Sequence, residues 1–277
     1  MSPTRYKILA TSVFFVLIVA SVATVVPLAF ESEDSTVAFS ASETSKPTIV
    51  LVHGAFADAS GWTDVIERLR KDGYSVIAPA NPLRSLSGDS AYIKSVLDQT
   101  PGPLVVVAHS YGGAVITNAA AGNPNVKALV YVDGFIPDVG EDGLKLAGEG
   151  SQVLTALEPR GFPPFGENDQ DFYIKQDAFR AVFCADLDAK TAAVMAATQR
   201  PIAAASYGEP TTAAAWKTIP SWAIIGLQDR VITPESLRAM ATRAGSTIVE
   251  LNSSHVSMIS HPKQVTDLIE EAAEATD

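Results

Sequence analysis

The sequence feature that most constrains the fold is the run PLVVVAHSYGGAV, in which an apolar stretch stops abruptly at a histidine, Ser110 and two glycines. Residues 104–107 have the pattern of a buried parallel strand, and residues 112–121 that of a helix. Ser110 therefore lies on a sharp strand-to-helix turn. Such a turn crowds its neighbours, so the positions two before and two after the serine must be small, and Ala108 and Gly112 are. The run predicts a nucleophilic serine held on this turn.

Short apolar runs alternate with amphipathic segments from Pro47 onward, which predicts β-α-β crossovers packed on a parallel sheet. Asp89 is expected to cap one of the helices, and His261 to open the last one. The six expected strands comprise residues 48–52, 74–78, 104–107, 127–132, 221–226 and 246–251.

The alternation lapses over residues 136–219, after the strand that ends at Asp133. A stretch of this length is far too long for a βα loop, so we expect an insertion with its own helices. A chain of 277 residues with 47% hydrophobic content can bury one sizeable core. Residues 47–277 are expected to form one α/β domain that carries this insertion as a cap.

The N-terminus has the composition of a targeting segment. Arg5 and Lys7 precede residues 8–30, which carry no charge. Residues 1–30 are therefore expected to be a secretory signal peptide or an uncleaved membrane anchor, and both alternatives imply export to the periplasm or the exterior. Residues 31–46 are acidic and rich in serine and threonine, which predicts a solvated linker.

The charge and the cysteine count exclude several classes of protein. A net charge of −11 repels phosphate backbones, so a nucleic-acid partner is not expected. Cys184 is the only cysteine, so no intrachain disulfide can form. We expect no metal and no cofactor, and a small molecule as the partner; the oligomeric state stays open.

Three side chains of a catalytic triad follow strands in the expected order. A serine hydroxyl needs an adjacent base, and the base needs an acid to hold it. Asp229 follows the strand WAIIG and His255 follows the strand TIVEL, so both project from the carboxyl edge of the sheet near Ser110. Asp133 is a second candidate acid, although it can equally accept N–H bonds in the turn toward Gly134. We predict Ser110 as nucleophile, His255 as base and Asp229 as acid.

An oxyanion hole is expected from two backbone N–H groups. Tyr111 supplies one at the start of the helix, and Ala55 supplies the other from the loop HGAFADASGW, where Gly54 allows a close approach. His53 is expected to brace this loop. His109 flanks the nucleophile but should point away from it, because neighbouring side chains at a strand end face opposite sides.

Five motifs lie between about Pro47 and the end of the chain: LVHGAFADASGW, AHSYGGAV, MAATQRP, GLQDRVITPE and SSHVSMISHP. With these motifs the chain resembles bacterial relatives of the plant methylesterase and hydroxynitrile lyase branch of the α/β-hydrolase superfamily. The resemblance implies an α/β-hydrolase fold, with a mostly parallel sheet of about six strands, flanking helices and a helical cap. Plant members that cleave cyanohydrins have a lysine after the catalytic histidine and a threonine in the first loop. Here these positions are Val256 and Gly54, which implies ester hydrolysis.

These observations predict a serine hydrolase that cleaves a small to medium uncharged carboxylic ester through an acyl-enzyme. A perhydrolase, a lactonase or a C–C hydrolase could use the same triad, and a ligand-binding receptor that has lost turnover is the alternative of another class. Aromatic side chains of the first loop and of the cap are expected to line the substrate pocket: Phe56, Phe179, Phe183 and Trp216.

Overall fold

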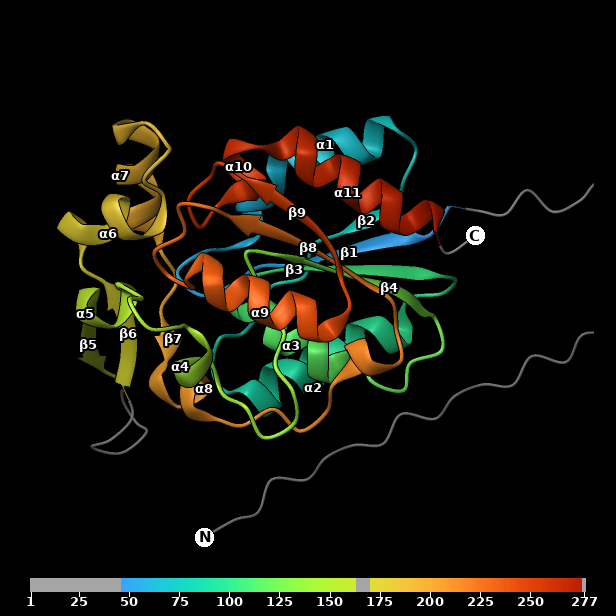
Figure 1. Ribbon diagram of the computed structural model, residues 1–277, viewed down its shortest axis with the longest axis horizontal. Helices are drawn as coiled ribbons and strands as arrows, with labels where there is room; N and C mark the ends of the chain where they lie inside the picture. The colour runs from blue at the N-terminus through green and yellow to red at the C-terminus, as the bar shows by residue number, and fades with distance from the viewer. Residues whose placement is uncertain (1–45, 163–169, 276–277) are drawn as a thin grey trace, which may run out of the picture. The chain divides into compact units, whose positions relative to one another are not determined.

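The computed structural model describes residues 46–162 and 170–275 (Figure 1). Its main sheet has six strands, all paired in parallel, in the order β2-β1-β3-β4-β8-β9. The strands are β1 (Thr48–Val52), β2 (Val76–Ile77), β3 (Leu104–His109), β4 (Val126–Val132), β8 (Ser221–Gly226) and β9 (Thr247–Leu251). The predicted α/β-hydrolase architecture is confirmed. Only β2 is much shorter than expected, because it lies at the sheet edge and pairs with β1 at two residues.

Helices cover both faces of this sheet (Figure 1). On one face lie α1 (Thr63–Lys71), α10 (Ser257–Ser260) and α11 (Pro262–Glu274), and on the other lie α2 (Leu86–Gln99), α3 (Tyr111–Ala119) and α9 (Pro234–Ala244). Every residue of β3 and β8 is buried, as expected for parallel strands with helices on both sides. The core therefore fixes the carboxyl ends of the strands, where the candidate site residues lie.

The start of α2 differs from the prediction. Ser85, not Asp89, caps the helix, so α2 begins before Asp89. The Asp89 carboxylate is buried and accepts hydrogen bonds from the Arg84 N–H, at 3.0 Å, and from the Tyr111 hydroxyl, at 2.8 Å. Burial raises its pKa. Asp89 therefore ties the start of α2 to the start of α3, the helix that follows Ser110, which sequence periodicity could not indicate.

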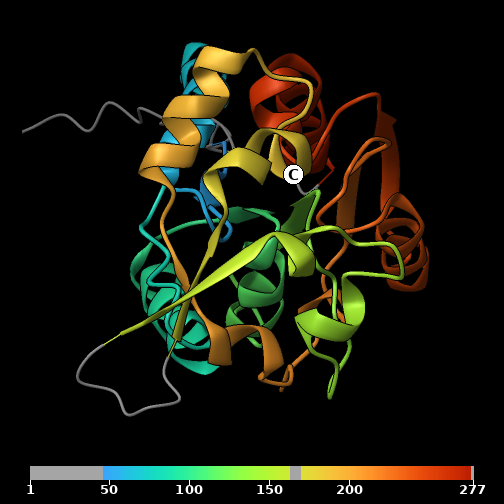
Figure 2. The ribbon, with the colours of Figure 1, turned by 90° about the vertical axis from the view of Figure 1, so that its left-hand side faces the viewer.

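The insertion contains helices, as expected, and also a small sheet (Figure 2). Its described elements are α4 (Gly143–Leu146), α5 (Val153–Ala156), β5 (Leu157–Gly161), β6 (Gln170–Ile174), α6 (Gln176–Phe183), α7 (Ala189–Thr198), β7 (Ile202–Ala203), α8 (Ala204–Gly208) and the 3-10 helix η2 (Ala215–Lys217). Strands β5, β6 and β7 form an antiparallel sheet. It was not predicted, because β5 reads LEPRG, which has a proline and charges in place of alternating apolar residues.

No helix in the described part of the chain is both long enough and apolar enough to cross a membrane. The uncharged stretch of residues 8–30 lies outside the described residues, and so does the expected linker.

Candidate active site

Ser110 stands between β3 and α3 in a strained backbone conformation, with φ of 53°. Positive φ is uncommon for residues other than glycine and costs free energy. The chain around the turn is crowded: a Cβ at Gly112 would lie 2.8 Å from the Val52 carbonyl oxygen, and one at Gly113 would lie 2.3 Å from the Phe135 carbonyl oxygen. The small residues that follow the serine are therefore required by backbone contacts.

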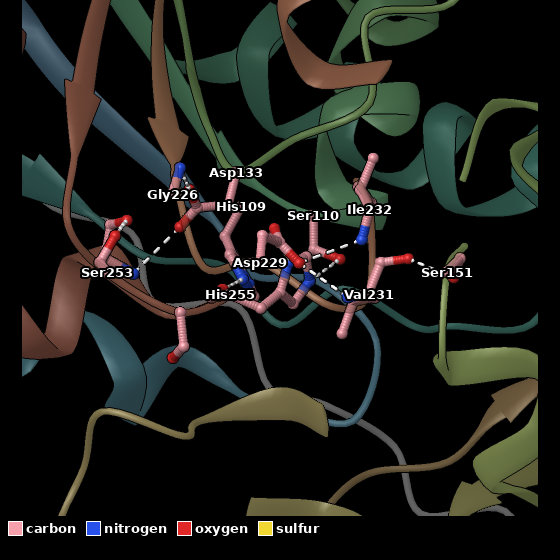
Figure 3. Close-up of polar contacts among 12 residues, drawn as sticks. His109, Ser110, Asp133, Ser151, Gly226, Asp229, Val231, Ile232, Ser253 and His255 are labelled. Carbon is pink, nitrogen blue, oxygen red and sulfur yellow. Dashed lines mark hydrogen bonds and ion pairs between the residues drawn. The ribbon is translucent and has the colours of Figure 1, made fainter. Parts of the chain in front are cut away.

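Ser110, His255 and Asp229 form one hydrogen-bonded series (Figure 3). The Ser110 Oγ lies 2.8 Å from the His255 Nε2, and the His255 Nδ1 lies 2.6 Å from an Asp229 carboxylate oxygen. The other oxygen of Asp229 accepts the N–H groups of Val231 and Ile232, at 2.7 and 3.0 Å. The carboxylate is thereby held in place and keeps the proton on Nδ1, which leaves Nε2 able to take the proton of the serine.

The loops after β8 and β9 bring Asp229 and His255 to the serine. Both strands are parallel to β3, so their carboxyl ends meet at one edge of the sheet. The two loops are also bound to each other, because the Gln228 N–H donates to the Ser253 carbonyl oxygen at 2.9 Å. The structure thus brings together all three residues that the sequence indicated as a triad.

Asp133, the second candidate acid, is not the hydrogen-bond partner of the His255 ring. Its two carboxylate oxygens accept the N–H groups of Gly226, at 2.8 Å, and Ser257, at 3.0 Å. The expected bonds toward Gly134 are not formed, because the side chain extends to β8 and α10 (Figure 3). Burial and the neighbouring Asp229 charge raise the pKa of Asp133 to about 7. Asp133 joins the segments that carry the acid and the base.

The loop after β1 passes directly against the serine. A Cβ at Gly54 would lie 2.6 Å from the Ser110 Cβ and 2.8 Å from the His109 carbonyl oxygen. Within the described residues, the backbone N–H groups of Ala55 and Tyr111 donate to no other group. The next N–H of the loop, that of Phe56, is taken by the Arg200 carbonyl oxygen at 3.0 Å.

Those two free N–H groups are the ones that the sequence indicated for an oxyanion hole. Tyr111 begins α3, and a helix N-terminus favours negative charge. Phe56 has a strained backbone, with φ of 59°. The loop therefore has a strained backbone where it passes Ser110.

Two further histidines support the site without reaching the serine hydroxyl. The His53 Nε2 accepts the Asn81 N–H at 2.9 Å, so its Nδ1 carries the proton and donates to the Gly54 carbonyl oxygen at 2.9 Å. The His109 Nε2 donates to the His255 carbonyl oxygen at 2.7 Å. Burial lowers the pKa of both histidines, so both are neutral at pH 7. Their role is to position the first loop and the backbone of the base.

Cap aromatics lie directly over the base. The Phe183 ring packs against the His255 ring with centroids 5.2 Å apart, and Phe179 packs on Phe183 at 5.0 Å. Phe56 meets Phe183 edge-on at 6.2 Å. Of the four aromatics expected to line a substrate pocket, these three therefore gather beside the triad, and all of them are buried.

Trp216 does not belong to this group. Its ring nitrogen donates to the Pro137 carbonyl oxygen at 2.8 Å, and its ring packs under Arg243 with the guanidinium 5.8 Å from the centroid. The expectation that Trp216 lines the pocket beside the triad does not fit this position. Trp216 instead fastens the end of the insertion to its beginning.

One contact at the site could not be expected from the sequence. The Asp186 carboxylate, between α6 and α7, accepts the Ser254 N–H at 3.1 Å and also binds the Ser254 hydroxyl. It thus holds the residue before His255 to the cap. No local pattern marks an aspartate for such a contact, because the two residues are 68 positions apart.

No group of three or more metal-binding side chains gathers anywhere in the described ranges. Cys184 is buried at the end of α6, and burial raises the pKa of its thiol to about 12. The thiol therefore stays protonated at neutral pH and contributes packing in the cap.

Replacing Gly54 with alanine is expected to lower kcat about 100-fold or more. The added Cβ overlaps Ser110 and displaces the loop that carries Ala55, the predicted oxyanion donor, and loss of one oxyanion donor costs about 10²–10³ in kcat. Steady-state kinetics with p-nitrophenyl acetate measure the effect. Gly208→Ala is the control, because its Cβ would meet only a leucine side chain at 3.8 Å. Wild-type kcat in Gly54→Ala would contradict this placement of the loop.

The fold and the site together define a class: α/β proteins with a parallel sheet and a serine on the turn between a buried strand and a helix. The sequence profile of the alpha/beta hydrolase family matches residues 49–268, and the chain belongs to this family of hydrolases. The resemblance predicted from the sequence is confirmed.

Two curated proteins illustrate the range of relatives. A probable hydrolase R7 of Phoma sp. is 28% identical over 250 residues, which are 83% of this chain and 99% of that protein. A carbendazim-hydrolysing esterase of Nocardioides sp. is 32% identical over 128 residues, which are 42% of this chain and 48% of that protein.

Solved structures share the fold. A pyrethroid hydrolase from Sphingobium faniae superposes with a TM-score of 0.68 at 21% identity, covering 83% of this chain and 98% of that one. Methylketone synthase I of tomato superposes with a TM-score of 0.71 at 21% identity, covering 84% and 99%.

Proposed function

We propose that the chain cleaves a small to medium uncharged carboxylic ester through Ser110, His255 and Asp229. The observation that carries this proposal is the unbroken series of hydrogen bonds from Asp229 through His255 to the hydroxyl of a serine held on a strained turn. The names of similar proteins, among them a carbendazim-hydrolysing esterase and a polyneuridine aldehyde esterase, support esters as the substrate class.

In the first half of the reaction, the Ser110 Oγ attacks the ester carbonyl carbon while the His255 Nε2 takes its proton. The carbonyl oxygen becomes negative and is held by the N–H groups of Ala55 and Tyr111. His255 then gives the proton to the departing alcohol, which leaves an acyl group on the serine. Asp229 stabilises the charged imidazole throughout.

In the second half, the same groups act on water. His255 takes a proton from a water molecule as its oxygen attacks the acyl carbon, and the second tetrahedral intermediate uses the same two N–H groups. Its collapse releases the acid and returns the proton to Ser110. His255 therefore transfers the proton in both halves of the reaction.

Two positions favour ester cleavage over cyanohydrin cleavage. The residue after His255 is Val256, which is fully buried and offers no charge to a leaving cyanide. A threonine could not replace Gly54 without displacing Ser110, since any Cβ there lies 2.6 Å from the serine Cβ.

The proposal is tested by mixing the enzyme with p-nitrophenyl acetate and following p-nitrophenol release in the first milliseconds, and by labelling with a fluorophosphonate. We expect turnover and a label on Ser110, located by peptide mass spectrometry. Three further assays separate the alternative activities of the same triad: lactone hydrolysis for a lactonase, peracid formation for a perhydrolase and β-diketone cleavage for a C–C hydrolase. Absence of both turnover and label would mean that the chain is a binding protein instead.

We further propose that residues 1–30 direct export, as a cleaved signal peptide or as an anchor, and that residues 47–277 are the catalytic domain. Deleting residues 1–30 is expected to leave a soluble protein with wild-type kcat, because the first strand of the described residues begins at Thr48. Gel filtration and the p-nitrophenyl acetate assay measure this. An inactive but monodisperse truncated protein would show that the segment contributes to the fold.

A further inference from the structure

A cavity of about 230 Å³ lies between the cap helix α7 and the part of the core that runs from the first loop into α1. Its cap wall includes Met195 and Gln199, and its core wall includes Phe56, Gly61 and Met258. None of the three triad residues lines it. The cavity is therefore a separate space, to which neither the sequence motifs nor the reaction steps above assign a role.

The cavity nevertheless adjoins both loops that act on the ester. Phe56 lines it and directly follows Ala55, the proposed oxyanion donor, while Val256 lines it and directly follows His255. Since only 2% of Ser110 is exposed, an ester bound at the serine must place its larger substituent into space beside these loops. The cavity is such a space.

Phe56 is one side chain that borders both the cavity and the surroundings of the triad. It borders the cavity on one side and meets Phe183 at 6.2 Å on the other, and Phe183 in turn covers His255. Phe56 has a strained φ of 59°, and its N–H is bound by the Arg200 carbonyl oxygen, just beyond α7. Phe56 therefore links the wall of the cavity to the aromatic side chains that cover His255.

The lining indicates the kind of group that the cavity accepts. Met195, Met258 and Phe56 supply apolar surface, and methionines adapt to ligands of different shape. Asp58 also lines it; burial would raise its pKa, but hydrogen bonds from Ser60 and the positive charge of Arg200 lower it.

No lysine or arginine lines the cavity, whereas Asp64 adds a second carboxylate to its wall. An anionic group would be repelled there. The volume is below that of sites for drug-sized ligands, so it suits a medium alkyl chain or one aromatic ring.

We infer that this cavity is the binding site for the larger, uncharged apolar substituent of the ester. The inference rests on the proposed ester hydrolysis and adds to it the location and the chemistry of substrate selection. Met195 faces this substituent from the cap, and Asp58 sets the preference for uncharged groups.

The test compares ethyl acetate, ethyl hexanoate and hexyl acetate as substrates of Met195→Trp, whose indole fills the cavity. For ethyl hexanoate, hexyl acetate or both, the ratio of kcat/KM to that of ethyl acetate is expected to fall about tenfold or more. A fall for ethyl hexanoate means that the acyl side enters the cavity, and a fall for hexyl acetate means that the alcohol side does. Met195→Ala, which enlarges the cavity, is expected to raise the same ratio. Val194→Trp is the matched control, because Val194 is on the same helix but is 57% exposed and does not line the cavity.

Charge selection is tested on the ester that Met195→Trp impairs. A terminal carboxylate on its longer chain is expected to lower kcat/KM about tenfold or more in the wild type and clearly less in Asp58→Asn, in which the asparagine can still cap the following helical turn. Equal penalties in both proteins would overturn the role of Asp58.

Unchanged ratios in both Met195 variants, with turnover of all three esters by the wild type, would overturn the assignment of the cavity and leave the proposed function standing. A wild type that hydrolyses none of the esters and takes no fluorophosphonate label would instead overturn the proposed function. Thermal unfolding of each variant shows whether it is folded, and Met195→Ala tests the assignment if the tryptophan variant does not fold.

Discussion

Ser110→Ala is expected to lower kcat for ester hydrolysis by about 10⁵–10⁶-fold and to leave the fold intact. The nucleophilic oxygen is lost, and removal of a triad serine leaves only the catalysis that binding and the oxyanion hole supply. The fold should persist because the Oγ has His255 as its hydrogen-bond partner, and alanine is smaller than serine at a crowded turn. Burst kinetics with p-nitrophenyl acetate and thermal unfolding measure both effects.

Ser151→Ala is the matched control for the loss of a hydroxyl near the triad. The Ser151 Oγ donates to the Val231 carbonyl oxygen at 2.7 Å, in the loop that carries Asp229, but it does not touch the triad (Figure 3). A loss of kcat below about tenfold is expected there. If Ser110→Ala kept near wild-type turnover, or if the fluorophosphonate labelled another residue, the proposed mechanism would be wrong.

Asp229→Asn is expected to lower kcat by about 10⁴-fold with little change in KM. The asparagine oxygen can still accept the N–H groups of Val231 and Ile232, so the loop keeps its conformation. Its amide nitrogen then faces the His255 Nδ1 and donates to it. The imidazole proton moves to Nε2, where it blocks transfer from Ser110. Steady-state kinetics across pH measure the loss.

Asp133→Asn, the matched substitution of the other buried acid, should reduce kcat much less. Asparagine offers one acceptor in place of two, so one of the N–H groups of Gly226 and Ser257 loses its partner. The cost should appear mainly as a lower melting temperature, because an unpaired buried N–H costs about 1–3 kcal/mol. The reverse ranking of kcat would assign the acid to Asp133, and small losses in both variants would mean that either carboxylate can serve.

Local sequence was sufficient to determine the elements that place the site. The apolar run before Ser110 and the small residues after it specify a buried strand and a sharp turn. The run Thr233-Pro234 caps and starts α9, and Gly245 ends it in the left-handed conformation, with φ of 68°. These features depend on residues a few positions apart, so their physical cause is contained in the local chain. The order of serine, acid and histidine follows from them.

Local pattern was less informative wherever distant segments meet. It predicted Asp89 as a helix cap, whereas the carboxylate binds Tyr111 on another helix. It grouped Trp216 with the cap phenylalanines, whereas Trp216 packs against Pro137 and Arg243. An aromatic or a carboxylate has the same local pattern whether it meets a ligand or a neighbouring helix.

The positions of the two candidate acids show most clearly what only the tertiary structure reveals. Asp133 and Asp229 both follow strands, and β4 and β8 are neighbours in the sheet, so both carboxylates start near the histidine. The strained backbone of Asp133, with φ of 46°, and its bonds to Gly226 and Ser257 hold it behind the site. The loop after β8 instead carries Asp229 to within 2.6 Å of the His255 Nδ1. Which carboxylate reaches the imidazole depends on the path of that loop across the sheet edge, and this path is set by contacts between segments far apart in the chain.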